Sequence, residues 1–218
     1  MTDLSTRLYL VTPPIADLAA FAPKLDEALG AGEIGCVLLR LAPGEAAATV
    51  ESLRSLVAAV QIHGVAALVE DGTRHLVGVE ADGVHVAGQG DALFLALRDL
   101  KPSRIVGAGQ LQLRDDAMLA GEQDIDYVMF GEAWENDPVQ DFDERLERVA
   151  WWAEIFQVPC VAFAHAAEEV EVFAAHGAEF VALGDVIWAD PRGPGAAIRD
   201  AEAAVRAGSA AFAARQLA

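Results

Sequence analysis

The sequence predicts a (β/α)8 barrel, and two observations favour this fold class. Short apolar runs alternate eight times with longer stretches of helical spacing along the 218 residues. Near-continuous aliphatic runs are typical of parallel strands that are covered on both faces. Eight strand-then-helix units in this length fit one closed barrel, so we expect a single domain over residues 1–218.

The predicted strands follow one another at regular intervals. They are Leu8–Val11, Cys36–Arg40, Ala66–Glu70, Gly83–Val86, Arg104–Gly109, Tyr127–Gly131, Cys160–Ala164 and Phe180–Asp185. An open doubly wound sheet is the structural alternative. It would usually carry a Gly-rich fingerprint after its first strand, where this chain has Thr12-Pro13-Pro14.

Helices are predicted between these strands because apolar residues recur there at three- and four-residue steps, which places them on one helix face. Two examples are Val50, Leu53, Val57 and Val60, and then Leu146, Val149, Ala153 and Phe156. The last helix is expected near residues 195–216.

Composition excludes several classes of protein. Hydrophobic residues make up 54% of the chain, and the net charge is −19. Such an acidic surface repels phosphate backbones and anionic lipid, so we expect neither nucleic-acid nor membrane binding. No apolar run approaches the length of a membrane span, and residues 1–20 lack a signal-peptide pattern, so a cytoplasmic location is expected. Cys36 and Cys160, the two cysteines, are interpreted as buried thiols.

Active sites of such barrels lie at the carboxyl ends of the strands, because the loops there converge on one mouth. The predicted strand ends carry many polar residues: Thr12, Arg40, Glu70, Asp71, His85, Gln89, Asp91, Gln110, Gln112, Glu132, Glu135, His165, Asp185, Asp190 and Arg192. Gly109, Trp134 and Trp188 lie at the same ends.

These motifs resemble the thiamine-phosphate synthase and thiazole tautomerase family nearly end to end. LYLVTP at Leu8–Pro13 resembles the family's first strand, and Arg40 matches an arginine in its Gln-x-Arg-x-Lys pattern. The segment from Ala67 to Asp91, ALVEDGTRHLVGVEADGVHVAGQGD, resembles the family's Asn-Asp step, Ala-Asp-Gly-Val-His strand and Gly-Gln-x-Asp loop. IVGAG, DYVMFG and HGAEFVALGDVIWADP fit the later strands.

The resemblance implies a reaction that joins an aminopyrimidine pyrophosphate to a thiazole phosphate and releases pyrophosphate. It implies Asp71 and Asp91 as ligands of Mg²⁺ and Arg40 as a contact of the pyrophosphate. Two carboxylates plus substrate oxygens suffice for this cation. By the same correspondence, Gly109 and Asp185 are substrate-contacting positions.

Much of the family's phosphate-binding chemistry is replaced in this chain. The substitutions are Leu38 and Ala42 for glutamine and lysine, Glu70 for asparagine, Gly109 and Leu111 for serine and histidine, Ala164-His165 for a glycine pair, and Gly184-Asp185 at a serine. The Thr- and Lys-bearing loop after strand six reads GEAWEND, with three carboxylates and no base. One carboxylate about 4 Å from a phosphate oxygen costs roughly 4 kcal/mol at an effective dielectric near 20. We therefore expect weak, lost or altered synthase activity.

Several candidate residues have a structural interpretation beside the functional one. Asp71 and Asp91 are metal ligands or loop and helix-cap acids, and Arg40 binds an anion or pairs with Glu70. His85 is interpreted as a satisfied core histidine.

Three other residues and one turn carry the same ambiguity. His165 is a candidate ligand contact or acid/base group. Trp134 and Trp188 close over a ring-shaped ligand or fill an unused pocket. The Gly193-Pro194-Gly195 turn receives an anion or is a plain turn.

Three hypotheses for function remain open. The first is a divergent thiamine-phosphate synthase with a small-molecule ligand that is a thiamine precursor. The second is a non-catalytic binding or regulatory barrel of the same family. The third is a metal-assisted enzyme with Asp71, Asp91, Glu132 and Asp185 as ligands. A homodimer is one assembly that the sequence leaves open.

Overall fold

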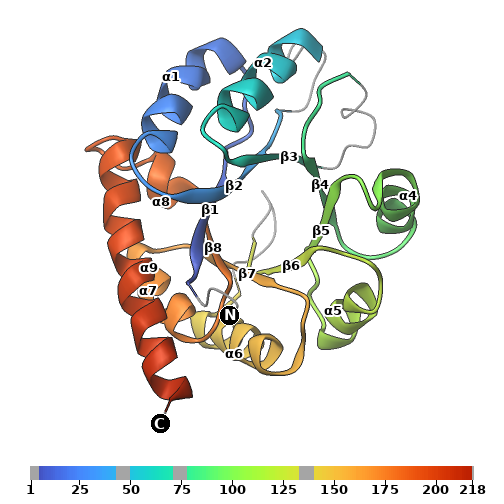
Figure 1. The fold of residues 1–218 in the computed structure, drawn as a ribbon, viewed down its shortest axis with the longest axis vertical. Helices are drawn as coiled ribbons and strands as arrows, with labels where there is room; N and C mark the ends of the chain where they lie inside the picture. The colour runs from blue at the N-terminus through green and yellow to red at the C-terminus, as the bar shows by residue number, and fades with distance from the viewer. Residues whose placement is uncertain (1–4, 43–49, 71–77, 133–139, 218) are drawn as a thin grey trace.

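A computed structural model describes residues 5–42, 50–70, 78–132 and 140–217, and it confirms the (β/α)8 barrel. Eight parallel strands close into one ring in sequence order, from β1 beside β2 round to β8 beside β1. The strands are β1 (Arg7–Val11), β2 (Ile34–Leu39), β3 (Ala66–Glu70), β4 (Gly83–Ala87), β5 (Ile105–Gly109), β6 (Tyr127–Phe130), β7 (Cys160–Ala164) and β8 (Phe180–Leu183). Figure 1 looks into this ring.

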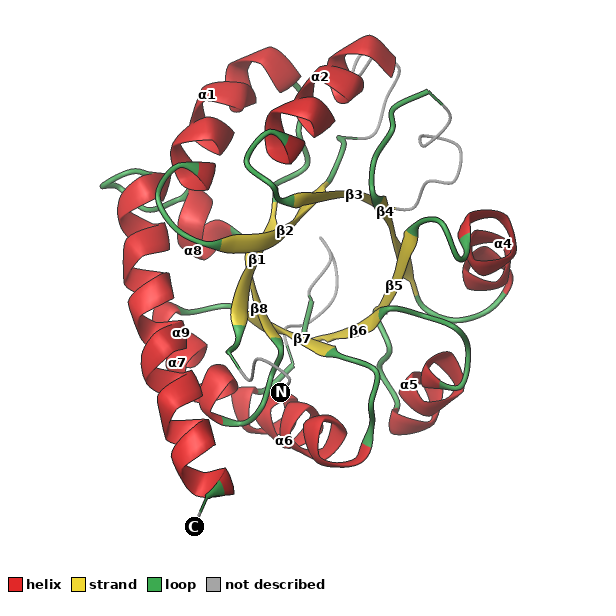
Figure 2. Cartoon of the chain, viewed as in Figure 1, coloured by secondary structure: helices red, strands yellow, loops and turns green. Residues whose placement is uncertain are grey.

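Helices surround the strands on the outside, as Figure 2 shows. They are α1 (Leu18–Leu29), α2 (Val50–Gln61), α4 (Asp91–Leu100), α5 (Arg114–Gly121), α6 (Phe142–Ile155), α7 (Ala167–Ala175), α8 (Asp185–Trp188) and α9 (Pro194–Gln216). Asp17 caps α1 by accepting from the Ala20 amide at 3.0 Å. Within the described ranges, no helix combines the length and apolarity that crossing a membrane requires.

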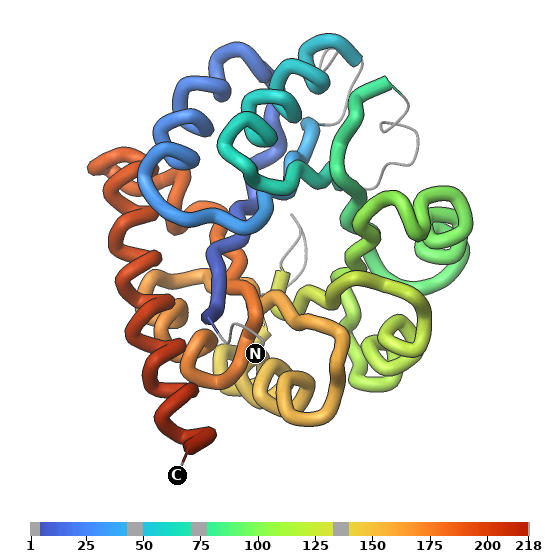
Figure 3. Tube along the Cα trace, in the orientation of Figure 1, coloured from blue at the N-terminus to red at the C-terminus, as the bar shows by residue number. Residues whose placement is uncertain are grey.

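The long helix α9 lies along α7 and α1, where the red tube passes down one side of the molecule in Figure 3. Gly208 makes the close approach to α7 possible, because a Cβ atom there would collide with the backbone carbonyl of Glu171. Ile198 and Val205 of α9 are buried in the same layer. The last helix therefore completes the outer shell.

Two apolar cores result from the alternation of side chains along each strand. The larger core lies between strands and helices, and the smaller one fills the inside of the barrel. The inner core contains Tyr9, Val11, Cys36, Leu38, Leu68, Tyr127, Met129, Val161 and Ala182. Both cysteines are free and buried, as predicted, and burial raises the pKa of each thiol.

Several predicted strand bounds differ from the structure by one or two residues, Phe156 lies just beyond the end of α6, and two further details are wrong. The eighth strand was expected to run through Asp185, but it ends at Leu183 because the short helix α8 begins at Asp185. Val50 was placed on the apolar face of its helix, but it is 52% exposed at the start of α2, and Leu56 takes part in the buried face instead.

Candidate functional site

Strands β2 and β3 end in an ion pair at the mouth of the barrel. Arg40 Nε donates to Glu70 Oε1 at 2.9 Å, and the two side chains are 16% and 14% exposed. The buried Thr12 accepts from the Arg40 backbone amide at 2.9 Å and so ties the end of β1 to β2. The pairing of Arg40 with Glu70, one of the two roles considered for this arginine, is present.

A column of polar side chains rises through the inside of the barrel to the same mouth. Tyr9 and Tyr127 share a hydrogen bond of 2.8 Å between their hydroxyl groups, across the ring from β1 to β6. The Tyr127 hydroxyl bonds His85 Nδ1 at 2.8 Å, and His85 Nε2 bonds Glu132 Oε2 at 3.0 Å. His85 has no exposed surface, which confirms its interpretation as a satisfied core histidine.

Glycines on β5 make room for this column. A Cβ atom at Gly107 would overlap the ring of Tyr127, and one at Gly109 would overlap Glu132 and His85. The strand can supply this space only by presenting no side chain to the interior. The role of Gly109 that the structure supports is therefore space for its neighbours, whereas its substrate contact stays a prediction.

His165 lies at the end of β7 and is held by its neighbours. Its Nε2 bonds the Gly131 carbonyl oxygen at 2.7 Å, which requires a proton on Nε2 because the carbonyl can only accept. Its backbone amide donates to Glu169 at 2.8 Å. Burial, and after it the charge of Arg145, lower the pKa of His165, although the bond to Gly131 acts in the opposite direction.

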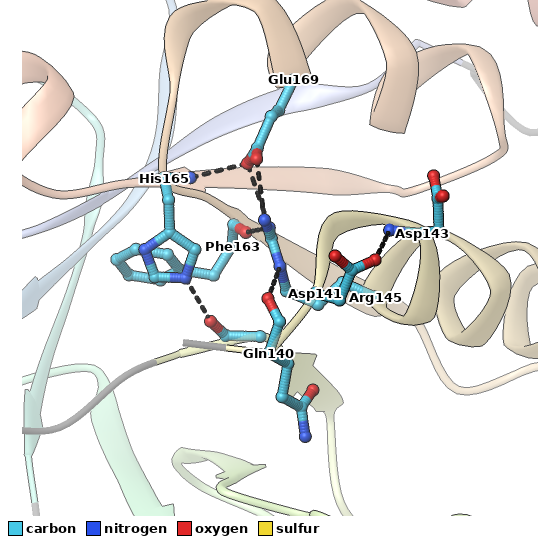
Figure 4. Close-up of polar contacts among 8 residues, drawn as sticks. Gln140, Asp141, Asp143, Arg145, Phe163, His165 and Glu169 are labelled. Atoms are coloured by element: carbon cyan, nitrogen blue, oxygen red, sulfur yellow. Dashed lines mark hydrogen bonds and ion pairs between the residues drawn. The ribbon is translucent and has the colours of Figure 1, made fainter. Parts of the chain in front are cut away.

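Arg145 is a buried cation beside this histidine, and Figure 4 shows it between Glu169 and the chain at Gln140. Its guanidinium donates to Glu169 at 2.7 and 3.0 Å, to the Phe163 carbonyl at 2.9 Å and to the Gln140 carbonyl at 3.1 Å. All three guanidinium nitrogens are thereby engaged. The cluster holds β7, α6 and α7 together at the mouth.

The other predicted residues are spread around the rim. Asp91 is exposed at the first position of α4, and Asp185 is exposed at the first position of α8, where a carboxylate suits the helix dipole. Trp188 packs on Phe21 with ring centroids 4.9 Å apart and donates its indole N–H to the Val11 carbonyl at 2.7 Å. These contacts account for packing by Trp188, and its role in ligand binding stays a prediction.

Three of the strand-end residues named from the sequence lie outside the described residues, namely Asp71, Trp134 and Glu135. The pairing of Trp134 with Trp188 and of Asp71 with Asp91 is therefore still a prediction. The described ranges contain no group of three or more His, Cys, Asp or Glu side chains that could hold a metal ion. The fit of Mg²⁺ to this mouth consequently rests on the sequence alone.

The amino end of α9 was a candidate anion site, and the structure shows a carboxylate of the chain there. Glu27 of α1 accepts a hydrogen bond from the Gly195 amide at 3.2 Å. Gly193, which precedes the helix, has φ of 92°, a conformation that favours glycine. The turn is thus closed by an internal acid.

The closed ring and the polar strand ends define a (β/α)8-barrel protein whose mouth carries Arg40, Glu70, Glu132 and His165. A family model described as "Thiamine monophosphate synthase" matches residues 8–187, and the chain belongs to this family.

Curated relatives agree with this assignment. A protein of Rhodospirillum centenum named "Thiamine-phosphate synthase" is 41% identical, over 92% of this chain and 97% of its own length. One of the same name from Hyphomonas neptunium is 33% identical, over 91% and 96%. The solved thiamine phosphate pyrophosphorylase of Pyrococcus furiosus superposes with a TM-score of 0.75 at 20% identity, covering 93% of this chain and 96% of its own. At that identity, the structural likeness supports the fold alone.

Sequence reasoning missed the interior column and the buried cation. Tyr9 and Tyr127 were counted only within strands, and Arg145 was not among the candidate residues. The signal for the column was available in the alternating glycines of IVGAG, which leave a gap inside any barrel that contains them. Arg145 had no signal of this kind, because its partners come from separate segments of the chain.

Proposed function

We propose that this protein catalyses the reaction of its family at a reduced rate. The C–O bond between the pyrimidine methylene and the pyrophosphate breaks, its electron pair leaves with the pyrophosphate, and the thiazole nitrogen forms the new C–N bond. Membership of the family supports the reaction. The observation that supports the reduced rate is the 2.9 Å ion pair between Arg40 and Glu70.

The argument for a slow reaction is electrostatic. A leaving pyrophosphate is stabilised by fixed cations whose charge is directed at it. Arg40 shares its charge with Glu70, and Glu132 adds a second carboxylate to the same pocket, which Val11 and Phe163 also line. An unfavourable term of about 4 kcal/mol corresponds to about a thousandfold in rate.

The roles of the individual residues are part of the proposal. Arg40 contacts the pyrophosphate, and His165 acts as a neutral ligand contact or acid/base group. Asp185 and Trp188 bind substrate together with the two positions named from the sequence, Gly109 and Trp134. Mg²⁺, held by Asp71 and Asp91, would neutralise the pyrophosphate; of these two acids, only Asp91 lies among the described residues.

A non-catalytic barrel that binds an unphosphorylated ring is the second candidate. The observations that favour it are that the Glu27 carboxylate accepts from the Gly195 amide at the start of α9 and that Glu132 lines the same pocket as Arg40. Nothing in the described part of the chain favours the metal-assisted enzyme. We also propose a cytoplasmic location, a small-molecule partner and no nucleic-acid or membrane partner; a homodimer would be measured by light scattering.

The test measures thiamine phosphate formed by the purified protein with both family substrates and Mg²⁺, beside the Rhodospirillum centenum relative. We expect turnover about a thousandfold below the relative. Glu70→Gln should raise the rate because it removes the carboxylate that shares the Arg40 charge, while Arg40→Met should abolish turnover. Equal rates for the two proteins would refute the reduced activity. No turnover, with thermal stabilisation by unphosphorylated rings alone, would establish the second candidate.

A further inference from the structure

Glu132 has one carboxylate oxygen that the fold leaves unsatisfied. Its side chain is 7% exposed, and Oε2 accepts from His85 at 3.0 Å. Oε1 is buried and has no hydrogen-bond partner among the described residues. Buried polar atoms are nearly always bonded, so an orphaned one needs an explanation, such as a ligand.

The column beneath Glu132 fixes the direction in which its protons point. Burial raises the pKa of Tyr9 and of Tyr127 well above the ordinary value, so both hydroxyls stay protonated. A carboxylate oxygen can only accept, so His85 Nε2 donates to Glu132 Oε2, and Nδ1 can accept from the Tyr127 hydroxyl. Tyr9 donates to Tyr127 in turn. The whole chain of donors ends on Oε2 and supports a carboxylate whose second oxygen can only accept.

Two narrow pockets meet at this carboxylate. One is lined by Gln110, Gln112 and Gln140 and has a cavity volume of about 30 Å³. The other lies toward Arg40 and Phe163. Each includes Glu132 and Met129, so the carboxylate stands between them. A space of about 30 Å³ holds a water molecule or a group of that size, such as an amino group.

We propose that Glu132 Oε1 is the acceptor for the amino group of a small-molecule ligand whose ring lies over the mouth. The amino group enters the pocket of about 30 Å³ that Gln110, Gln112 and Gln140 line. A carboxylate accepts hydrogen bonds from N–H groups and repels phosphate oxygens. This contact would therefore favour a heterocycle that presents an amino group. The geometry at Glu132 does not depend on the proposed reaction. The choice of an aminopyrimidine as the ligand does rest on the proposed reaction.

The experiment compares 4-amino-2-methylpyrimidine with 2-methylpyrimidine, which lacks the amino group. Their dissociation constants are measured by ligand-observed NMR on the whole chain. We expect the amino compound to bind about tenfold more tightly or better, because hydrogen bonds to charged groups are strong.

The substitution Glu132→Gln removes the charge and keeps the shape of the side chain. The amide oxygen would stay on His85 Nε2, and the amide NH2 would then face the amino group of the ligand, donor against donor. The affinity for the amino compound should fall about tenfold or more and that for 2-methylpyrimidine should not change. Glu144→Gln, at an exposed position on α6, is the matched control and should leave both unchanged. Circular dichroism checks that each variant is folded.

The outcomes separate this inference from the proposed reaction. Equal affinity for the two rings, absence of binding, or unchanged affinity in folded Glu132→Gln would overturn it. If Glu132→Gln weakens binding of the amino ring in a protein that shows no turnover, the inference stands and the proposed reaction fails. If Glu132→Gln turns over substrate with an unchanged KM, the proposed reaction stands and the inference about Glu132 fails.

Discussion

Replacing Arg145 by methionine should destabilise the protein strongly. The arginine side chain is 3% exposed and makes four hydrogen bonds, two of them to Glu169. Methionine fills much of the same volume and supplies no donor. The substitution therefore tests the buried charge while largely preserving the packing.

The magnitude follows from what the change leaves behind. Glu169 is 12% exposed, and without Arg145 its remaining recorded donor is the His165 backbone amide at 2.8 Å. Removing one partner of a buried ion pair costs about 3–5 kcal/mol, because the other charge stays buried without compensation. The carbonyls of Gln140 and Phe163 also lose their donor.

Urea unfolding followed by tryptophan fluorescence measures this loss. At a slope of about 3 kcal/mol per M, the midpoint should fall by about 1–1.7 M. Arg206→Met is the matched control: this side chain is 72% exposed, pairs with Glu202 and should change stability by about 0.5 kcal/mol or less. A loss below about 1 kcal/mol in Arg145→Met would refute the reasoning. Replacing Glu169 by leucine in the same chain should recover part of the loss.

Acid should narrow the difference between wild type and Arg145→Met. Burial opposes ionisation of Glu169, but hydrogen bonds from Arg145 and the His165 amide outweigh it and hold the pKa of Glu169 below its ordinary value. A lowered pKa adds stability above the unfolded-state value, about 4.3, and this stability is lost as the pH falls through the folded-state value. Unfolding free energies should therefore converge below about pH 4; parallel curves would contradict this origin.

Three further predictions concern the packing. Cys36 and Cys160 should not react with a thiol reagent in the native protein, because burial raises both thiol pKa values, and both should react after denaturation; rapid native labelling would contradict their burial. Gly107→Ala should cost about 3 kcal/mol or more by urea unfolding, because the new methyl group overlaps the ring of Tyr127; a stable variant would mean that the ring has room to move. Trp188→Phe should lower stability by about 1–3 kcal/mol, since the β1 carbonyl loses its indole donor; an unchanged melting curve would argue against that bond.

The strands were predictable because both faces of the closed sheet are covered, so each strand is a nearly continuous apolar run. Cys160–Ala164 and Ala66–Glu70 have the predicted bounds. Boundaries failed where a local feature overrides hydrophobicity, as at Gly184, which is the cap of α8 and ends the strand before Asp185. Hydrophobicity does not encode such a turn.

The site was predictable only in part. Arg40 and Glu70 end adjacent strands, so their pairing follows from strand order alone. The bond between Tyr9 and Tyr127 joins residues 118 positions apart and exists only because the barrel closes. The contact of His165 with the Gly131 carbonyl depends on the register between β6 and β7, which residue spacing in the sequence does not specify.

The Glu27 carboxylate of α1 occupies the amino end of α9, where a dissolved anion could otherwise bind. The Glu27 carboxylate belongs to the same chain as the Gly195 amide, so a dissolved phosphate or sulfate has to compete with an acceptor that is held in place. An anionic ligand would have to displace Glu27 before it could bind at this helix end.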